Sequence, residues 1–113
     1  MKLSVRMQQS GLVVSVMENR IDAAGAIEFK DRMREAAETP AATVILDLSN
    51  VQFLDSSGLG AVVAVMKHLA PKRKLELAGL NPPVAKVFRL TRMDSVFTIH
   101  AAVPGSTDLS RAV

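Results

Sequence analysis

The first part of the chain alternates between apolar and polar residues before it becomes more uniformly apolar. Leu3, Val5 and Met7 are separated by polar or charged residues, and this period of two predicts a strand with one buried face. Residues 9–11 have the composition of a turn. Residues 12–17 are mostly apolar and predict a second strand. The two strands are expected to form an antiparallel hairpin at a sheet edge.

The next segment has the spacing of a helix. Asp22 precedes it and is expected to cap it, because its carboxylate can accept free amide protons in the first turn. Glu28 and Arg32 lie four residues apart and are expected to form an exposed ion pair. The helix should end before Pro40. The apolar positions at helical spacing are Ala26, Phe29, Met33 and Ala37.

The middle of the chain contains its most apolar strand. Residues 44–48 are β-branched and nearly all apolar, as in a central parallel strand covered by helices. Residues 49–57 are rich in small polar side chains and predict a turn. A second helix follows and should end at Pro71. Its expected apolar face comprises Leu59, Val62, Val63, Met66 and Leu69.

The last third repeats the pattern of strand and helix. Residues 75–78 predict a strand, and residues 81–83 (Asn-Pro-Pro) predict a helix start. Residues 96–99 predict a final strand, and residues 104–113 form a polar tail that is helical, frayed or disordered. After the hairpin, strands and helices alternate, which favours an α/β fold with helical crossovers. We expect a mixed, mostly parallel sheet of about five strands with three to four helices, in one domain over 1–113.

Composition narrows the classes of function. The chain has 113 residues, 49% of them hydrophobic, and no cysteine, so disulfides and thiolate metal sites are excluded. Its longest apolar stretch, residues 58–66, is far shorter than the roughly 20 residues of a membrane span. We therefore expect a soluble, cytoplasmic protein without membrane insertion. The net charge of +3 is accompanied by only four phenylalanines and by no tryptophan or tyrosine, which favours a solvated surface over direct nucleic-acid binding.

One loop carries candidate chemistry. It leaves the carboxyl end of the central strand and enters the second helix, where α/β sheets tend to build their sites. Ser56 and Ser57 begin this helix beside Gly58, and its free amides and dipole would tolerate a phosphate on Ser56. Taken alone, the Asp-Ser-Ser-Gly run is typical of an ordinary helix cap.

The same residues give little support for a catalytic function. No Gly-x-Ser-x-Gly or Walker motif is present. His68 and His100 are isolated in the sequence, so neither is placed to activate a serine. Asp22 and Asp55 are too few to indicate a metal site. We expect no enzymatic activity, no cofactor and no bound metal; a small serine hydrolase or nucleotide-binding enzyme is the least favoured class.

The segment 53–60 (Phe-Leu-Asp-Ser-Ser-Gly-Leu-Gly), which follows Asp47-Leu48, resembles the motif of anti-sigma factor antagonists of the STAS family. The resemblance extends over almost the whole chain and implies the STAS fold. It departs from the family at Asn19, where many relatives have glycine, and after Asp22, where relatives often have a hydroxyl group. The resemblance implies that Ser56 is a phosphate acceptor.

The same resemblance implies a partner-switching cycle. The unphosphorylated protein would bind an anti-sigma factor that is also a serine kinase (a GHKL-type ATPase) and so release a sigma factor. Phosphorylation of Ser56 would end binding, and a serine phosphatase would restore it. The alternative is a STAS subunit of a membrane transporter or other regulatory complex that is not phosphorylated. The oligomeric state is expected to be a monomer or weak dimer.

A surface for the partner is predicted beside the acceptor. Along the second helix, Ser57, Gly60 or Ala61, Ala64 and His68 are expected to form a stripe of mostly small residues opposite the apolar face. Small residues there would let a partner helix approach closely, although they are also tolerated on an ordinary surface. The predicted partner-binding residues are Asp22, Asp55, Ser56, Ser57, Gly58, Gly60, Ala61 and Ala64.

Overall fold

A computed structural model describes residues 1–105, so most of the predicted tail lies outside the described residues. The helices are α1 (Ala26–Ala36), α2 (Ser56–Leu69), α3 (Pro82–Leu90) and the short 3-10 helix η1 (Met93–Ser95). The strands are β1 (Leu3–Gln8), β2 (Gly11–Val16), β3 (Arg20–Ile21), β4 (Thr43–Asp47), β5 (Phe53–Leu54), β6 (Lys74–Ala78) and β7 (Ile99–His100).

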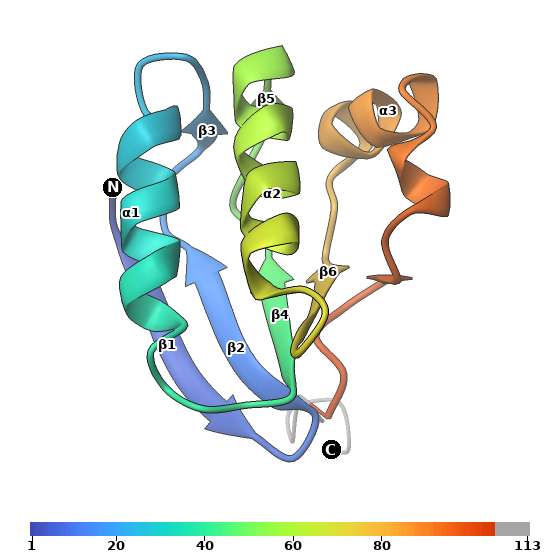
Figure 1. The fold of residues 1–113 in the computed structure, drawn as a ribbon. Coiled ribbons are helices and arrows are strands. Elements are labelled where there is room, and N and C mark those ends of the chain that lie inside the picture. The colour runs from blue at the N-terminus through green and yellow to red at the C-terminus, as the bar shows by residue number, and fades with distance from the viewer. Residues whose placement is uncertain (106–113) are drawn as a thin grey trace, which may run out of the picture.

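The main sheet has five strands in the order β1-β2-β4-β6-β7 (Figure 1). β1 and β2 are antiparallel, and the pairs β2–β4, β4–β6 and β6–β7 are parallel. The predicted α/β class, the edge hairpin and the central position of β4 are therefore confirmed. A separate parallel pair, β3 with β5, was not predicted.

The helices cover one face of this sheet, and α1 and α2 lie side by side across it (Figure 1). Alternate residues of the strands, such as Val14 and Leu46, bury their side chains under these helices. On the opposite face Val13, Ile45 and Ala78 form a second buried cluster against Val103. The prediction that helices cover the central strand is thus right for one face, whereas a chain segment covers the other.

The final strand was predicted too early in the chain. Residues 96–99 were expected to form it, but β7 contains only Ile99 and His100. Phe97 instead turns into the core, where its ring packs edge-on against Phe88 with a centroid distance of 5.8 Å. The apolar character of this segment therefore reflects a core contact in the connection after η1.

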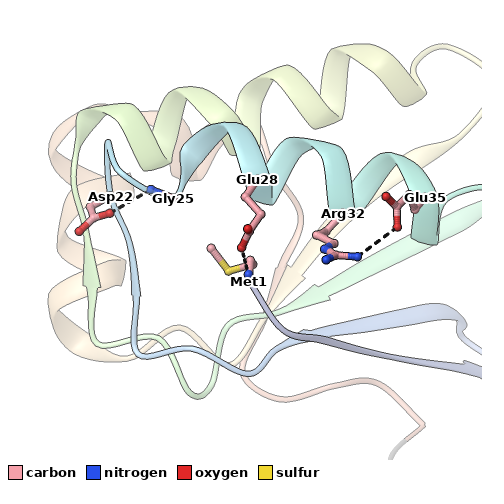
Figure 2. A network of polar contacts seen from close by, with 6 residues as sticks. All are labelled: Met1, Asp22, Gly25, Glu28, Arg32 and Glu35. Atoms are coloured by element: carbon pink, nitrogen blue, oxygen red, sulfur yellow. Dashed lines mark hydrogen bonds and ion pairs between the residues drawn. The ribbon is translucent and has the colours of Figure 1, made fainter.

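Two predictions about α1 were wrong in detail (Figure 2). Its N-cap is Gly25, without a side-chain cap, and Asp22 closes the preceding turn by accepting the Gly25 N–H at 3.2 Å. Glu28 pairs with the amino group of Met1, because the start of β1 lies beside this helix. Arg32 pairs instead with Glu35, at 3.5 Å.

Candidate functional site

The site begins with the cap of α2. Asp55 has an extended backbone, and its Oδ1 accepts the N–H of Gly58 at 2.8 Å. An N-cap carboxylate of this kind satisfies one of the free amides of the first turn and favours the positive end of the helix dipole. The helix consequently starts at Ser56, as expected for the serine pair, whereas the turn predicted over 49–57 extended too far, because β5 lies within it and α2 already includes Ser56 and Ser57.

Gly58 allows the chain to pass unusually close to α2. A Cβ atom at this position would lie 2.1 Å from the carbonyl oxygen of Ile21, a distance that no real contact permits. The backbone segment that approaches the glycine is the end of β3. The glycine serves packing here rather than a turn.

A second set of contacts ties β3 to the same helix start. Oδ2 of Asp55 accepts the N–H of Ala23 at 3.1 Å, so one carboxylate holds both segments. Asp22 lies next to this contact, and its Oδ2 pairs with Arg20 at 3.2 Å. The parallel pairing of β3 with β5 thus brings two distant predicted site residues, Asp22 and Asp55, to one end of the molecule.

Ser56 and Ser57 are exposed on the first turn of α2. Within residues 1–105, neither their hydroxyl groups nor their amides form a hydrogen bond. The amides are the free donors expected at a helix start. A group attached to either hydroxyl would therefore break no hydrogen bond of the described fold.

The site also contains two residues that the sequence analysis did not assign. Phe53 is 45% exposed although it is aromatic, and the guanidinium carbon of Arg20 lies 5.0 Å from the centre of its ring. An exposed aromatic side chain with a stacked arginine has the composition of an interface contact. The signal in the sequence was an aromatic residue three positions before the helix start, but the neighbouring strand β3 was too short to predict.

The outer face of α2 differs from the predicted stripe. Ser57 and Gly60 are exposed, and nothing lies within 4 Å of where a Gly60 Cβ would be. Ala61, in contrast, is only 3% exposed and belongs to the core, so its expected place on the outer stripe was wrong. Ala64 is half-buried in a groove that α2 forms with α1. Gly58 is also buried and presents no side chain to a partner.

Residues 1–105 contain no cluster of side chains arranged for catalysis or metal binding. His68 is exposed near the far end of α2, in the groove with α1. The Nε2 atom of His100 lies 2.7 Å from Glu76 on the sheet, away from Ser56. No group of three or more histidine, aspartate or glutamate residues gathers in this part of the chain to hold a metal ion.

The comparisons with known proteins agree with this geometry. The model of the STAS domain family matches residues 4–105, and the chain therefore belongs to this family. A STAS-domain containing protein of Pseudomonas aeruginosa is 30% identical over 84 residues, covering 74% of this chain and 82% of its own length. The anti-sigma F factor antagonist of Paenibacillus polymyxa is 25% identical over 103 residues, with 88% of each chain covered.

Solved structures show the same fold. An anti-sigma factor antagonist from Mycobacterium paratuberculosis superposes with a TM-score of 0.80 at 24% identity, covering 90% of this chain and 86% of that one. SpoIIAA of Bacillus in its phosphorylated form gives a TM-score of 0.65 at 20% identity, with coverage of 99% and 100%. The murine anion transporter Slc26a9 contains a similar fold, with a TM-score of 0.70 at 15% identity over 90% of this chain and 18% of the transporter.

The predicted resemblance to anti-sigma factor antagonists is thereby confirmed. None of the helices in the described part of the chain has the length and apolar character needed to cross a membrane.

Proposed function

We propose that this protein is an anti-sigma factor antagonist whose binding to an anti-sigma factor serine kinase is ended by phosphorylation of Ser56. The observation that carries the proposal is the exposed serine on a helix start that Asp55 caps and that packs against the end of β3 at Gly58. Relatives named as anti-sigma factor antagonists support the type of partner. A related fold that has been solved in a phosphorylated form supports the modification.

The switch works through charge. A phosphoserine adds about −1.5 to −2 charge units at neutral pH, next to Asp55, whose contact with Ala23 also brings Asp22 and its ion-pair partner Arg20 to this end of the molecule. A partner covering Ser56 would have to desolvate that phosphate or meet it with a like charge. A loss of roughly 3 to 4 kcal/mol in binding free energy weakens the affinity for the partner by a few hundredfold.

The fold itself should not change. The Ser56 hydroxyl makes no hydrogen bond within residues 1–105, so its esterification removes none of the contacts that hold α2. The free amides of the first turn and the helix dipole favour an anion there. Amide exchange over α2 should therefore not become faster on phosphorylation, and a loss of protection there would refute a purely electrostatic switch.

The proposal is tested by incubating the protein with ATP and an anti-sigma kinase encoded near its gene, followed by intact-mass analysis and peptide mapping. One phosphate on Ser56 is expected. Ser56→Ala should prevent labelling and keep the kinase bound, whereas the matched control Ser57→Ala should be labelled normally. Loss of labelling in Ser57→Ala alone would make Ser57 the acceptor.

The STAS fold within an anion transporter supports a second candidate, a transporter-associated subunit without phosphorylation. That likeness concerns the fold alone. The Asp55-Ser56-Ser57-Gly58 run, which is intact and has both serines exposed, favours the phosphorylation switch. Absence of any phosphate after kinase treatment, together with co-purification of a membrane transporter, would favour the subunit instead.

A further inference from the structure

The outer edge of β1 is not paired with another strand in the described part of the chain. β1 is antiparallel to β2 in continuous register, and the Met17 N–H donates to the Lys2 carbonyl at 2.9 Å. Hydrogen-bonded and non-bonded pairs alternate in such a ladder. The even-numbered residues of β1 therefore point their backbone N–H and C=O groups toward β2. Leu3, Val5 and Met7 therefore turn their backbone N–H and C=O groups away from the sheet.

This edge has little of the protection that edge strands usually carry. Charges, prolines, bulges or a covering element normally prevent strand addition, but β1 has no proline and pairs all six of its residues in register. Val5 and Met7 are 45% and 55% exposed. Arg6 is the one charged residue within β1, and it leans inward to donate to Ser15 Oγ at 3.2 Å.

We propose that this edge pairs with the β1 strand of a second copy of the chain, antiparallel about a two-fold axis at Val5. In this register Val5 lies opposite its own copy and Leu3 lies opposite Met7, so the apolar side chains meet on one face. On the other face, Ser4 lies opposite Arg6, and Lys2 lies opposite Gln8. No two like charges are opposed.

The neighbouring registers are disfavoured by charge. A shift that moves the axis to Ser4 places Lys2 opposite Arg6, and a shift that moves it to Arg6 places Arg6 opposite itself. Like charges directly opposite each other destabilise a strand pair. Of these three registers, only the one centred on Val5 places no two like charges directly opposite each other.

The resulting dimer is weak and reversible. One six-residue strand from each copy forms the contact, which is smaller than the roughly 1,200 Å² of a stable interface. A dissociation constant of about 1 µM or weaker is expected. The candidate site contains no residue of β1, so this inference does not depend on the proposed function.

Analytical ultracentrifugation of the full chain over a concentration series tests the proposal, with a monomer–dimer equilibrium expected. Val5→Lys should abolish the dimer, because two lysines would meet at the axis. The matched control Ile27→Lys, at a 70% exposed position on α1, should leave it unchanged. A monomer at all concentrations up to about 1 mM, where about 4 kcal/mol of binding would register, would overturn the proposal, as would a dimer unaffected by Val5→Lys.

A second variant tests the register and does not depend on how well Val5→Lys folds. Ser4→Glu would place a carboxylate opposite Arg6 twice in the proposed dimer, and it should tighten association about two- to thirtyfold at low salt. If the axis were at Ser4, the same change would oppose two glutamates and weaken the dimer. Weakened or unchanged association would therefore refute the proposed register.

Discussion

Two glycines that lie two residues apart in α2, on different faces of the helix, should respond in opposite directions to the same substitution. A Cβ atom at Gly58 would lie 2.1 Å from the carbonyl oxygen of Ile21 and 2.8 Å from a methyl carbon of Leu54. A Cβ atom at Gly60 would meet nothing within 4 Å. Alanine at either position gains helix propensity of up to about 1 kcal/mol. The difference between the variants therefore isolates the contact of α2 with β3.

For Gly58→Ala the clash outweighs the gain in helix propensity, so the variant should be less stable than the parent chain. The obstructing atom belongs to the backbone, so β3 must move away from α2, which strains the hydrogen bond from the Ala23 N–H to Asp55. Overpacking costs about 1–3 kcal/mol, and each weakened hydrogen bond costs about 0.5–1.5 kcal/mol. After subtracting the propensity gain, we expect a net loss of about 1–3 kcal/mol, or about 4–12 °C in Tm. Gly60→Ala should instead gain about 0.5–1 kcal/mol, because its added methyl group is unopposed.

Thermal unfolding followed by circular dichroism, together with urea titration, measures both variants against the parent chain. Hydrogen exchange should localise the damage of Gly58→Ala to β3 and the first turn of α2. If Gly58→Ala were as stable as Gly60→Ala, the close approach of Ile21 to the helix would be wrong. The two variants also separate an effect on stability from an effect on partner binding, because Gly60 lies on the outer face of α2 and Gly58 does not.

Three further substitutions test how the fold is held, each by urea unfolding. Asp55→Ala removes the acceptor for two backbone N–H groups and should cost about 1–2 kcal/mol, so an unchanged midpoint would contradict the cap. Arg73→Met frees three carbonyl groups between α1 and β4 and should cost about 1.5–3 kcal/mol, of which Arg73→Lys should recover less than half because lysine lacks the planar fork. Phe29→Ala empties a fully buried site and should cost about 3–5 kcal/mol, whereas Ile27→Ala at a 70% exposed position should change stability by less than about 0.5 kcal/mol.

The parts of the fold that the sequence predicted are those with a long, regular pattern. The apolar run over residues 44–48 and the apolar face of α2 are each repeated over several positions, so a single ambiguous residue does not alter the assignment. The β3–β5 pair could not be found in this way because each strand has only two residues. The pair is accompanied by the close fit of Gly58 against Ile21, a contact between segments distant in the sequence that no local pattern indicates.

The candidate site was predicted unevenly for a similar reason. The helix start at Ser56 followed from local capping chemistry, which a short motif contains in full. The burial of Ala61 did not, because alanine fits both a helix surface and a close contact with neighbouring elements. The exposure of Phe53 was also hidden, since an aromatic residue in a short apolar segment is ordinarily expected in the core.

The division of roles around the start of α2 explains how a modification there could act without cost to the fold. Asp55 and Gly58 hold the helix against the end of β3, through the hydrogen bond from the Ala23 N–H to Asp55 and a close backbone contact, while the Gly58 N–H caps the helix at Asp55. Ser56 and Gly60 face outward, and Ser56 makes no hydrogen bond to the rest of residues 1–105. Asp55 and Gly58 fix the position of the helix start, and therefore the place where a charge on Ser56 would lie. Ser56 itself can be modified because its side chain takes no part in holding the helix. A phosphate there would therefore alter what the surface repels and leave the elements beneath it in place.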